Sequence, residues 1–179
     1  MSPELVSPWR EFLEDLDNLL PARLDLHCIG GFAAVAMYGL PRSTNGLDYI
    51  HIESNNAPDL ESIAGEGSPL AKKHKVFVHY VTIATYPEDY DRRLKQLFPN
   101  RFKNLRLLVL DPYDLVLSKL SRNSAKDQED VKYLARMQHL DPEILRERYN
   151  EELRCNLIGP AERADNTLKF WIEAYFSQQ

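Results

Sequence analysis

Cysteine is scarce in this chain, and long apolar runs are missing altogether. The two cysteines, Cys28 and Cys155, lie far apart among 179 residues. No apolar run reaches the roughly 18 residues that a membrane-spanning helix needs, and no charged and then apolar leader opens the chain. These absences indicate a soluble, cytoplasmic protein with no membrane partner.

Positive charge is also in short supply. Lysine and arginine number 22 against 27 aspartate and glutamate residues, which gives a formal net charge of -5. This balance argues against broad, nonspecific binding to nucleic acid, although a local basic patch can still serve such binding. A phosphate-bearing ligand would therefore need local basic groups or backbone amides.

Hydrophobic residues make up 44% of the chain, enough for one globular domain with a helical appendage. Helical spacing of apolar residues predicts an opening helix over residues 8–20, stopped by Pro21. Asp111 followed by Pro112 marks an explicit helix start. Strands are predicted over residues 24–29, 47–53, 76–84 and 105–111, and helices over 32–40, 86–98, 111–120, 124–137, 141–154 and 162–176, with a weak helix among loops in 55–74.

This order of elements predicts an α+β fold, in which a small mixed β-sheet core carries flanking helices and a C-terminal helical segment. We expect residues 1–23 to form the N-terminal helix and residues 24–111 the α+β core. Residues 112–179 are expected to form a helical segment packed on that core.

The most informative stretch runs from Cys28 to Glu53. Gly30-Gly31 follows the first predicted strand, where glycine permits a tight turn and a close backbone approach to a ligand. Asp48 lies in an alternating strand and is expected to share one face with apolar Ile50 and Ile52, which favours a site role over simple exposure. An ordinary strand-to-helix turn remains the alternative for the glycines.

These features resemble the nucleotidyltransferases of the DNA polymerase beta superfamily. The resemblance rests on Gly-Gly after a strand, on Tyr-Gly-hydrophobic-Pro-Arg over residues 38–42, on Ser43-Thr44 and on the strand that bears Asp48. It continues in the strand, Asp-Pro and lysine pattern of "LRLLVLDPYDLVLSKL" and in the "KDQEDV" helix, and it covers roughly residues 24–135. The closest likeness is to the abortive-infection AbiEii-type toxins and their uncharacterised bacterial relatives.

The resemblance implies binding of a nucleoside triphosphate with Mg²⁺ and transfer of a nucleoside monophosphate to a protein or RNA acceptor. It makes Asp48 the catalytic residue and metal ligand. It also implies a cognate antitoxin or a homodimer as a partner. The residues that it places at the nucleotide are Gly30, Gly31, Arg42, Ser43, Thr44 and Lys119.

The sequence departs from the family at the metal site. The family usually carries Asp-x-Asp, whereas Gly46 stands here in place of the first aspartate. The strand predicted over 76–84 contains no acid, so His79 is its only polar ligand candidate. Two interpretations stay open: a nucleotidyltransferase with a weakened metal site, and a degenerate, noncatalytic binding or regulatory module of a toxin-antitoxin or phage-defence system. A second acid from Glu53, Glu88 or Asp89 would favour the enzyme.

Other residues favour structural roles. His79 is more typical of a packed strand histidine than of a ligand, and His27 and Cys28 are expected in the core. Lys126 and Asp130 have the spacing of an ordinary ion pair on a helix surface. The aromatic residues of the last two helices are expected to pack in the core, and one face of the last helix is left for a partner. They are Tyr149, Phe170, Trp171, Tyr175 and Phe176.

Overall fold

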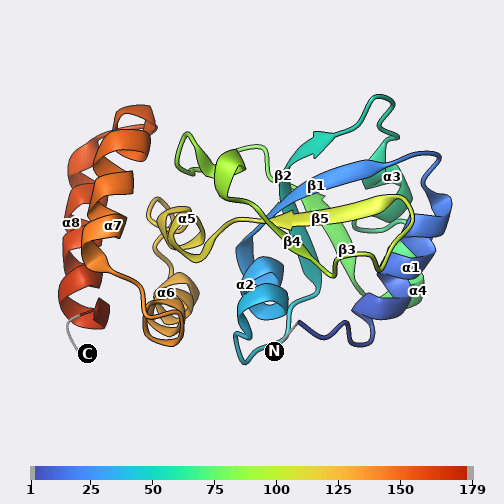
Figure 1. The fold of residues 1–179 in the computed structure, drawn as a ribbon, viewed down its shortest axis with the longest axis horizontal. Helices are drawn as coiled ribbons and strands as arrows, with labels where there is room; N and C mark the ends of the chain where they lie inside the picture. Colours follow the sequence, from blue (N-terminus) through green and yellow to red (C-terminus); the bar gives the residue numbers. More distant parts are fainter. Residues whose placement is uncertain (1–2, 177–179) are drawn as a thin grey trace. The chain divides into compact units, whose positions relative to one another are not determined.

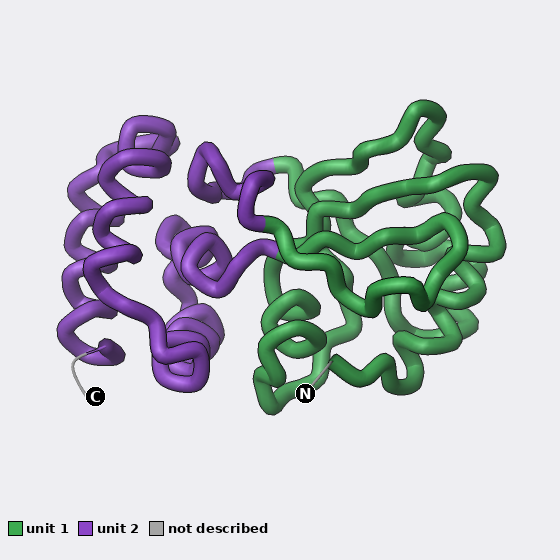
Figure 2. The backbone as a smooth tube through the Cα atoms, in the orientation of Figure 1, with its two compact units in different colours: residues 1–82, 94–109 green, residues 83–93, 110–179 purple. Residues whose placement is uncertain are grey.

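A computed structural model describes residues 3–176 and has the predicted α+β fold (Figure 1). The chain divides into two compact units (Figure 2). Unit 1 comprises residues 1–82 and 94–109, and unit 2 comprises residues 83–93 and 110–179. Unit 2 therefore contains a short internal segment as well as the C-terminal helices.

The sheet of unit 1 has five strands in the order β3-β2-β1-β5-β4. The central strand β1 runs antiparallel to β2 and parallel to β5, while β2 is parallel to β3 and β4 is antiparallel to β5. The expected mixed sheet is thus confirmed. Its strands are β1 (Leu24–Ile29), β2 (Gly46–Glu53), β3 (Phe77–Tyr80), β4 (Lys95–Leu97) and β5 (Leu105–Val109).

One irregularity in β2 corrects the expected alternation of its side chains. The register between β1 and β2 shifts at His27 and Cys28, so Ile50 has no partner in the β1 register. Tyr49 and Ile50 are consequently both buried. A shift of one residue exchanges the faces of a strand, so the prediction that Asp48 and Ile52 share a face is wrong.

The helices of unit 1 cover the sheet through apolar side chains. The predicted amphipathic opening helix is α1, whose Trp9 ring lies edge-on to Phe32 of α2 at 4.6 Å. The buried Asp17 of α1 accepts backbone hydrogen bonds from Lys103, Asn104 and Leu105, which satisfies its charge. The helices are α1 (Trp9–Leu19), α2 (Gly30–Tyr38), α3 (Leu60–Ala64) and α4 (Pro69–His74).

The helix predicted over residues 86–98 is wrong. A 3-10 turn forms over Tyr90–Arg93, and Lys95–Leu97 forms the edge strand β4. Because β4 satisfies its backbone groups by pairing with β5, tertiary pairing overrides the local helical pattern. The third strand is also shorter than predicted, since β3 ends at Tyr80.

The described part of unit 2 is built from helices and turns. Asp111 and Asp141 cap α5 and α7 as their Asp-Pro pairs predict, accepting from the amides of Asp114 at 2.9 Å and Glu143 at 2.8 Å. Trp171 is fully buried, as expected for core packing. The elements are α5 (Pro112–Leu117), α6 (Ala125–Met137), α7 (Pro142–Arg148), a π-helical turn (Tyr149–Leu153), a 3-10 turn (Arg154–Asn156), α8 (Ala161–Trp171) and a second π-helical turn (Ile172–Phe176).

Candidate functional site

Asp48 and Gly30 are brought together by the pairing of β1 with β2. Asp48 pairs with Ile29, the last residue of β1, and Gly30 follows at once as the first residue of α2. Gly30 has a positive φ of 73°, and a Cβ atom built on it would lie 2.5 Å from Asp48 Oδ2. Only glycine therefore fits here, because a side chain would be strained and would collide with the carboxylate.

Gly31 plays the same spatial role toward Arg42. A Cβ atom on Gly31 would lie 2.7 Å from Arg42 Nη2, so the guanidinium lies directly beside the first turn of α2. Arg42 also donates a hydrogen bond from Nη1 to the carbonyl of Ser43 at 3.4 Å. The N-cap residue Ile29 offers no side-chain acceptor to the amides of this turn. Amides at a helix start beside a guanidinium are suited to an anion.

The loop between α2 and β2 places the remaining predicted residues of this stretch. Thr44 donates a hydrogen bond from Oγ1 to the carbonyl of Gly46 at 3.2 Å, and Ser43 is exposed. A Cβ atom on Gly46 would meet the Phe77 ring at 3.5 Å and Asp48 Oδ1 at 3.9 Å, which are ordinary contact distances. Position 46 thus has room for a side chain, although none is present.

His79 is the residue nearest to Asp48 on the neighbouring strand. The two residues are paired in the parallel register of β2 and β3, and His79 Nδ1 lies 3.2 Å from Asp48 Oδ1. The exposed fractions of the side chains are 57% for His79 and 36% for Asp48. The sequence favoured a packed histidine, whereas the structure exposes this one beside the candidate metal ligand.

None of the acids proposed as a second ligand lies within unit 1 beside Asp48. Glu53 pairs with Asp25 at the far end of β2, five residues from Asp48, or about 17 Å along a strand. Glu88 and Asp89 belong to unit 2. Residues 3–176 hold no group of three or more His, Cys, Asp or Glu side chains arranged to bind a metal ion.

Cys28 and His27 are confirmed as buried residues of the sheet. Burial, and then the nearby charge of Asp48, raise the pKa of the Cys28 thiol far above its ordinary value. A thiol that stays protonated is a poor nucleophile. Cysteine chemistry is therefore not supported at this position.

Lys119 lies in unit 2, where its side chain is almost fully buried. Its Nζ donates to Asp130 Oδ2 at 2.9 Å and lies 3.5 Å from Asp127 Oδ1. The predicted surface pair between Lys126 and Asp130 is therefore wrong: Asp130 is buried and bonds to Lys119 instead. Arg122 binds Asp127 through two further hydrogen bonds. A contact between Lys119 and a triphosphate stays a prediction.

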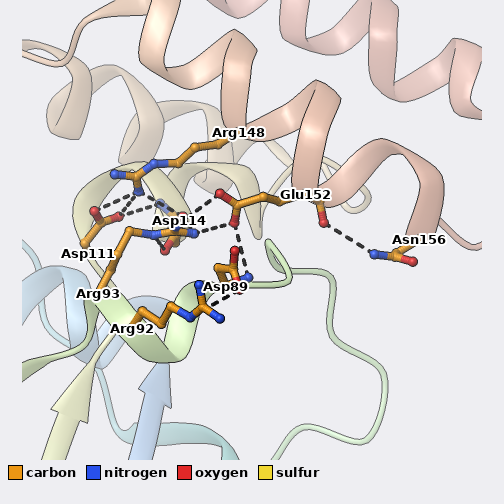
Figure 3. A network of polar contacts seen from close by, with 8 residues as sticks. All are labelled: Asp89, Arg92, Arg93, Asp111, Asp114, Arg148, Glu152 and Asn156. Carbon is orange, nitrogen blue, oxygen red and sulfur yellow. Dashed lines mark hydrogen bonds and ion pairs between the residues drawn. The ribbon is translucent and has the colours of Figure 1, made fainter.

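A second charged cluster in unit 2 was not predicted (Figure 3). Arg93 donates from Nε to Asp114 Oδ2 at 2.8 Å and from Nη2 to Glu152 Oε2 at 2.6 Å. Arg148 donates to Asp111 Oδ2 at 2.7 Å and to Asp114 Oδ1 at 3.0 Å. The sequence identified Asp111 and Asp114 as helix-start residues. No local signal pairs Asp114 with Arg93, 21 positions away, or Asp111 with Arg148, 37 positions away.

The cluster perturbs its members in opposite directions. Burial raises the pKa of Asp114 even though Arg93 hydrogen-bonds to it. Burial opposes the charge of Arg93, but its hydrogen bonds to Glu152 and Asp114 outweigh this and raise the pKa of the guanidinium further. The hydrogen bond from Arg93 lowers the pKa of Glu152. Asp114 is thus the costly charge of the cluster, and it depends on its arginine partners.

Comparison with known proteins assigns the class of this chain. Residues 10–178 match the model of a family described as "Nucleotidyltransferase of unknown function (DUF6036)". Because the match covers most of the chain, the protein belongs to this nucleotidyltransferase family, which confirms the resemblance at that level. The particular likeness to AbiEii-type toxins stays a prediction.

No curated protein and no solved structure matches the chain. None of the helices among residues 3–176 has both the length and the apolar character needed to cross a bilayer.

Proposed function

We propose that unit 1 binds a nucleoside triphosphate together with a divalent cation, and that the protein transfers the nucleoside monophosphate to a protein or RNA acceptor. One observation carries this proposal. The two glycines that open α2 leave room for two groups of opposite charge, the Asp48 carboxylate at Gly30 and the Arg42 guanidinium at Gly31. A nucleotide with its cation carries the complementary charges, because its phosphates are negative like the groups that Arg42 attracts and its cation is positive like the groups that Asp48 attracts.

The phosphate half of the proposed site is the start of α2. The first amides of a helix lack intrahelical acceptors, and the helix dipole adds partial positive charge there. Arg42 adds a full charge next to these amides. The hydroxyls of Ser43 and Thr44 follow in the same loop and are further candidates for phosphate contacts.

The cation half of the proposed site is Asp48. Mg²⁺, the ion that the family resemblance implies, is commonly held by one or two carboxylates, with water and substrate phosphates completing its octahedron. A single carboxylate fits this pattern only when the nucleotide supplies further oxygen ligands. A bound cation would stabilise the charge that develops on phosphoryl oxygens during in-line displacement.

A noncatalytic function is the second candidate, and a specific observation favours it. Among the described residues, no group of three or more His, Cys, Asp or Glu side chains is arranged to hold a metal ion, and Gly46 leaves the expected position without a carboxylate. A degenerate member of the family would keep the scaffold and use it to bind a partner, such as an antitoxin-like protein or a second copy of the chain.

Calorimetric titration with each of the four common nucleoside triphosphates and Mg²⁺ tests both candidates. We expect cation-dependent binding by the natural chain and a loss of at least about tenfold in Asp48→Asn, because even outer-shell changes at metal sites cost that much. Gly46→Asp should bind more tightly, since its Cβ atom fits and its carboxylate would lie on the same strand face as Asp48. Glu53→Gln removes an acid from the far end of β2 and serves as the control.

The outcomes separate the two candidates. Binding by the natural chain that Asp48→Asn removes and Glu53→Gln retains supports the nucleotide site. Binding by Gly46→Asp alone identifies a disabled scaffold and favours the partner-binding function. Absence of binding by all four proteins contradicts the nucleotide site.

A further inference from the structure

An imidazole lies beside the Asp48 carboxylate, at a separation that would let the two groups share one ion. His79 stands directly opposite Asp48 in the pairing of β2 with β3, and neither side chain is buried. Their facing atoms are 3.2 Å apart. Two ligands about 2.1 Å from one ion and at right angles to each other lie about 3 Å apart, so this separation suits two adjacent positions on one cation.

The chemistry of these two side chains determines which cation would suit them. Mg²⁺ is a hard ion that takes oxygen ligands almost exclusively, and an imidazole in its first shell adds little. Divalent ions of the first transition row accept imidazole nitrogen together with carboxylate oxygen. One of these ions, Mn²⁺, also keeps the octahedral, oxygen-rich coordination that triphosphate oxygens and water provide.

We propose that His79 is a cation ligand next to Asp48 and that it makes the site select a first-row transition cation of the Mn²⁺ kind over Mg²⁺. The inference rests on the proposed nucleotide site and refines the choice of its cation. In this arrangement, the His79 imidazole supplies a cation ligand where residue 46, a glycine, supplies no carboxylate. The 3.2 Å contact between His79 and Asp48 is then the resting state of a two-residue cation site.

The simpler interpretation is a hydrogen bond that only orients Asp48. That interpretation predicts equal effects of His79 substitutions on Mn²⁺ and Mg²⁺ binding, because an oriented carboxylate serves both ions. A ligand role predicts unequal effects. The ratio of the two affinities, compared between variants, therefore distinguishes the interpretations and also cancels the preference that the free nucleotide has for either ion.

The experiment measures Mn²⁺ binding by loss of the free-ion electron paramagnetic resonance signal, followed by displacement with Mg²⁺. It is run on the full chain with and without a nonhydrolysable ATP analogue. His79→Ala should weaken Mn²⁺ binding at least about tenfold and leave Mg²⁺ nearly unchanged. His79→Asp replaces nitrogen with oxygen, so it should shift the preference toward Mg²⁺ by about tenfold. His51→Ala, which removes an exposed histidine further along β2, should change neither affinity.

Each outcome bears on the inference. A Mn²⁺ to Mg²⁺ affinity ratio that falls in His79→Ala and in His79→Asp supports it, whether or not the nucleotide analogue is required. Nucleotide-dependent cation binding with the same ratio in all proteins overturns the inference and leaves the proposed function standing. Absence of cation and nucleotide binding, with normal thermal unfolding of each variant, overturns both.

Discussion

Gly30 and Gly67, both in unit 1, have backbone conformations that L side chains rarely adopt, but their surroundings differ. Their φ angles are 73° and 84°. A Cβ atom on Gly30 would lie 2.5 Å from Asp48 Oδ2, whereas one on Gly67 would have no heavy atom within 4 Å. The pair therefore separates the cost of backbone strain from the cost of crowding the candidate site.

We expect Gly30→Ala to be clearly more destabilising than Gly67→Ala. The left-handed backbone alone costs roughly 1–2 kcal/mol for alanine. Displacement of the Asp48 carboxylate adds roughly 1–3 kcal/mol, the usual range for overpacking. Urea unfolding measures the two free energies, and nucleotide titration of the folded fraction should show weaker binding in Gly30→Ala alone. Equal losses of stability would mean that Asp48 moves aside without cost.

At the residue scale, local patterns predict the tight turn at the glycines and the strand that carries Asp48, although the alternation predicted for that strand is broken at Ile50. The sequence was less informative about His79 and Arg42. The ring of His79 reaches Asp48 only through the register of β2 with β3. Arg42 reaches Gly31 only because the loop after α2 folds back onto its first turn. Both contacts depend on tertiary pairing, which no local pattern encodes.

At the scale of elements, sequence patterns were reliable where a cap or a long apolar period defines the segment. The Asp-Pro starts of α5 and α7 are confirmed because the capping side chain and the fixed proline φ act within one turn. The helix predicted over residues 86–98 does not form, because Lys95–Leu97 makes its hydrogen bonds with β5 as a strand. A short edge strand carries little local signal, so its partner decides its conformation.

The start of α6 combines a helix cap with a buried ion pair. Asp127 accepts from the amide and hydroxyl of Ser124, while the Ser124 hydroxyl accepts from the Asp127 amide. Burial alone would raise the pKa of Asp127, but hydrogen bonds from Arg122 and Ser124 outweigh it, and the pKa is held well below the ordinary value of 3.8. A depressed folded pKa means that the charged form stabilises the fold.

We therefore expect the stabilising effect of Asp127 to depend on pH. The contribution is fully present above the unfolded pKa of about 3.9 and is lost as the pH falls toward the lower folded value. Asp127→Asn should cost about 2 kcal/mol at pH 7, between a lost cap and a broken buried pair. Urea unfolding at pH 7 and pH 3 should show this difference shrinking at the lower pH. Glu129→Gln, an exposed acid on the same helix, should stay within about 0.5 kcal/mol at both pH values. A cost for Asp127→Asn that is the same at both pH values would contradict the linkage.

At the scale of the whole molecule, the chain leaves unit 1 after residue 82, returns at residue 94 and leaves again after residue 109. The sequence predicted a continuous core over residues 24–111, since nothing in the composition marks residues 83–93 as part of another unit. Contacts between residues far apart in the sequence explain why this segment belongs to unit 2. Glu152 accepts a hydrogen bond from the amide of Asp89 at 3.2 Å and another from Arg93 (Figure 3). The internal segment is thus held to the C-terminal helices by charged groups.

Arg93 and its neighbour Arg92 differ in burial and in the strength of their ion pairs. Arg93→Ala should destabilise unit 2 by roughly 3 kcal/mol, because it leaves the fully buried Asp114 with one cationic partner fewer and removes the main partner of Glu152. Arg92→Ala is the matched control, since the Arg92 side chain is 77% exposed and pairs only loosely with Asp89, at 3.6 Å, so it should cost less than about 0.5 kcal/mol. Native-state hydrogen exchange should then show faster exchange in residues 83–93, in α5 and in the turn Tyr149–Leu153 for Arg93→Ala alone, with β1 and β2 unchanged. Faster exchange in β1 and β2 as well would show that the two units open as one cooperative body, and unchanged exchange everywhere would show that Arg93 does not hold the segment.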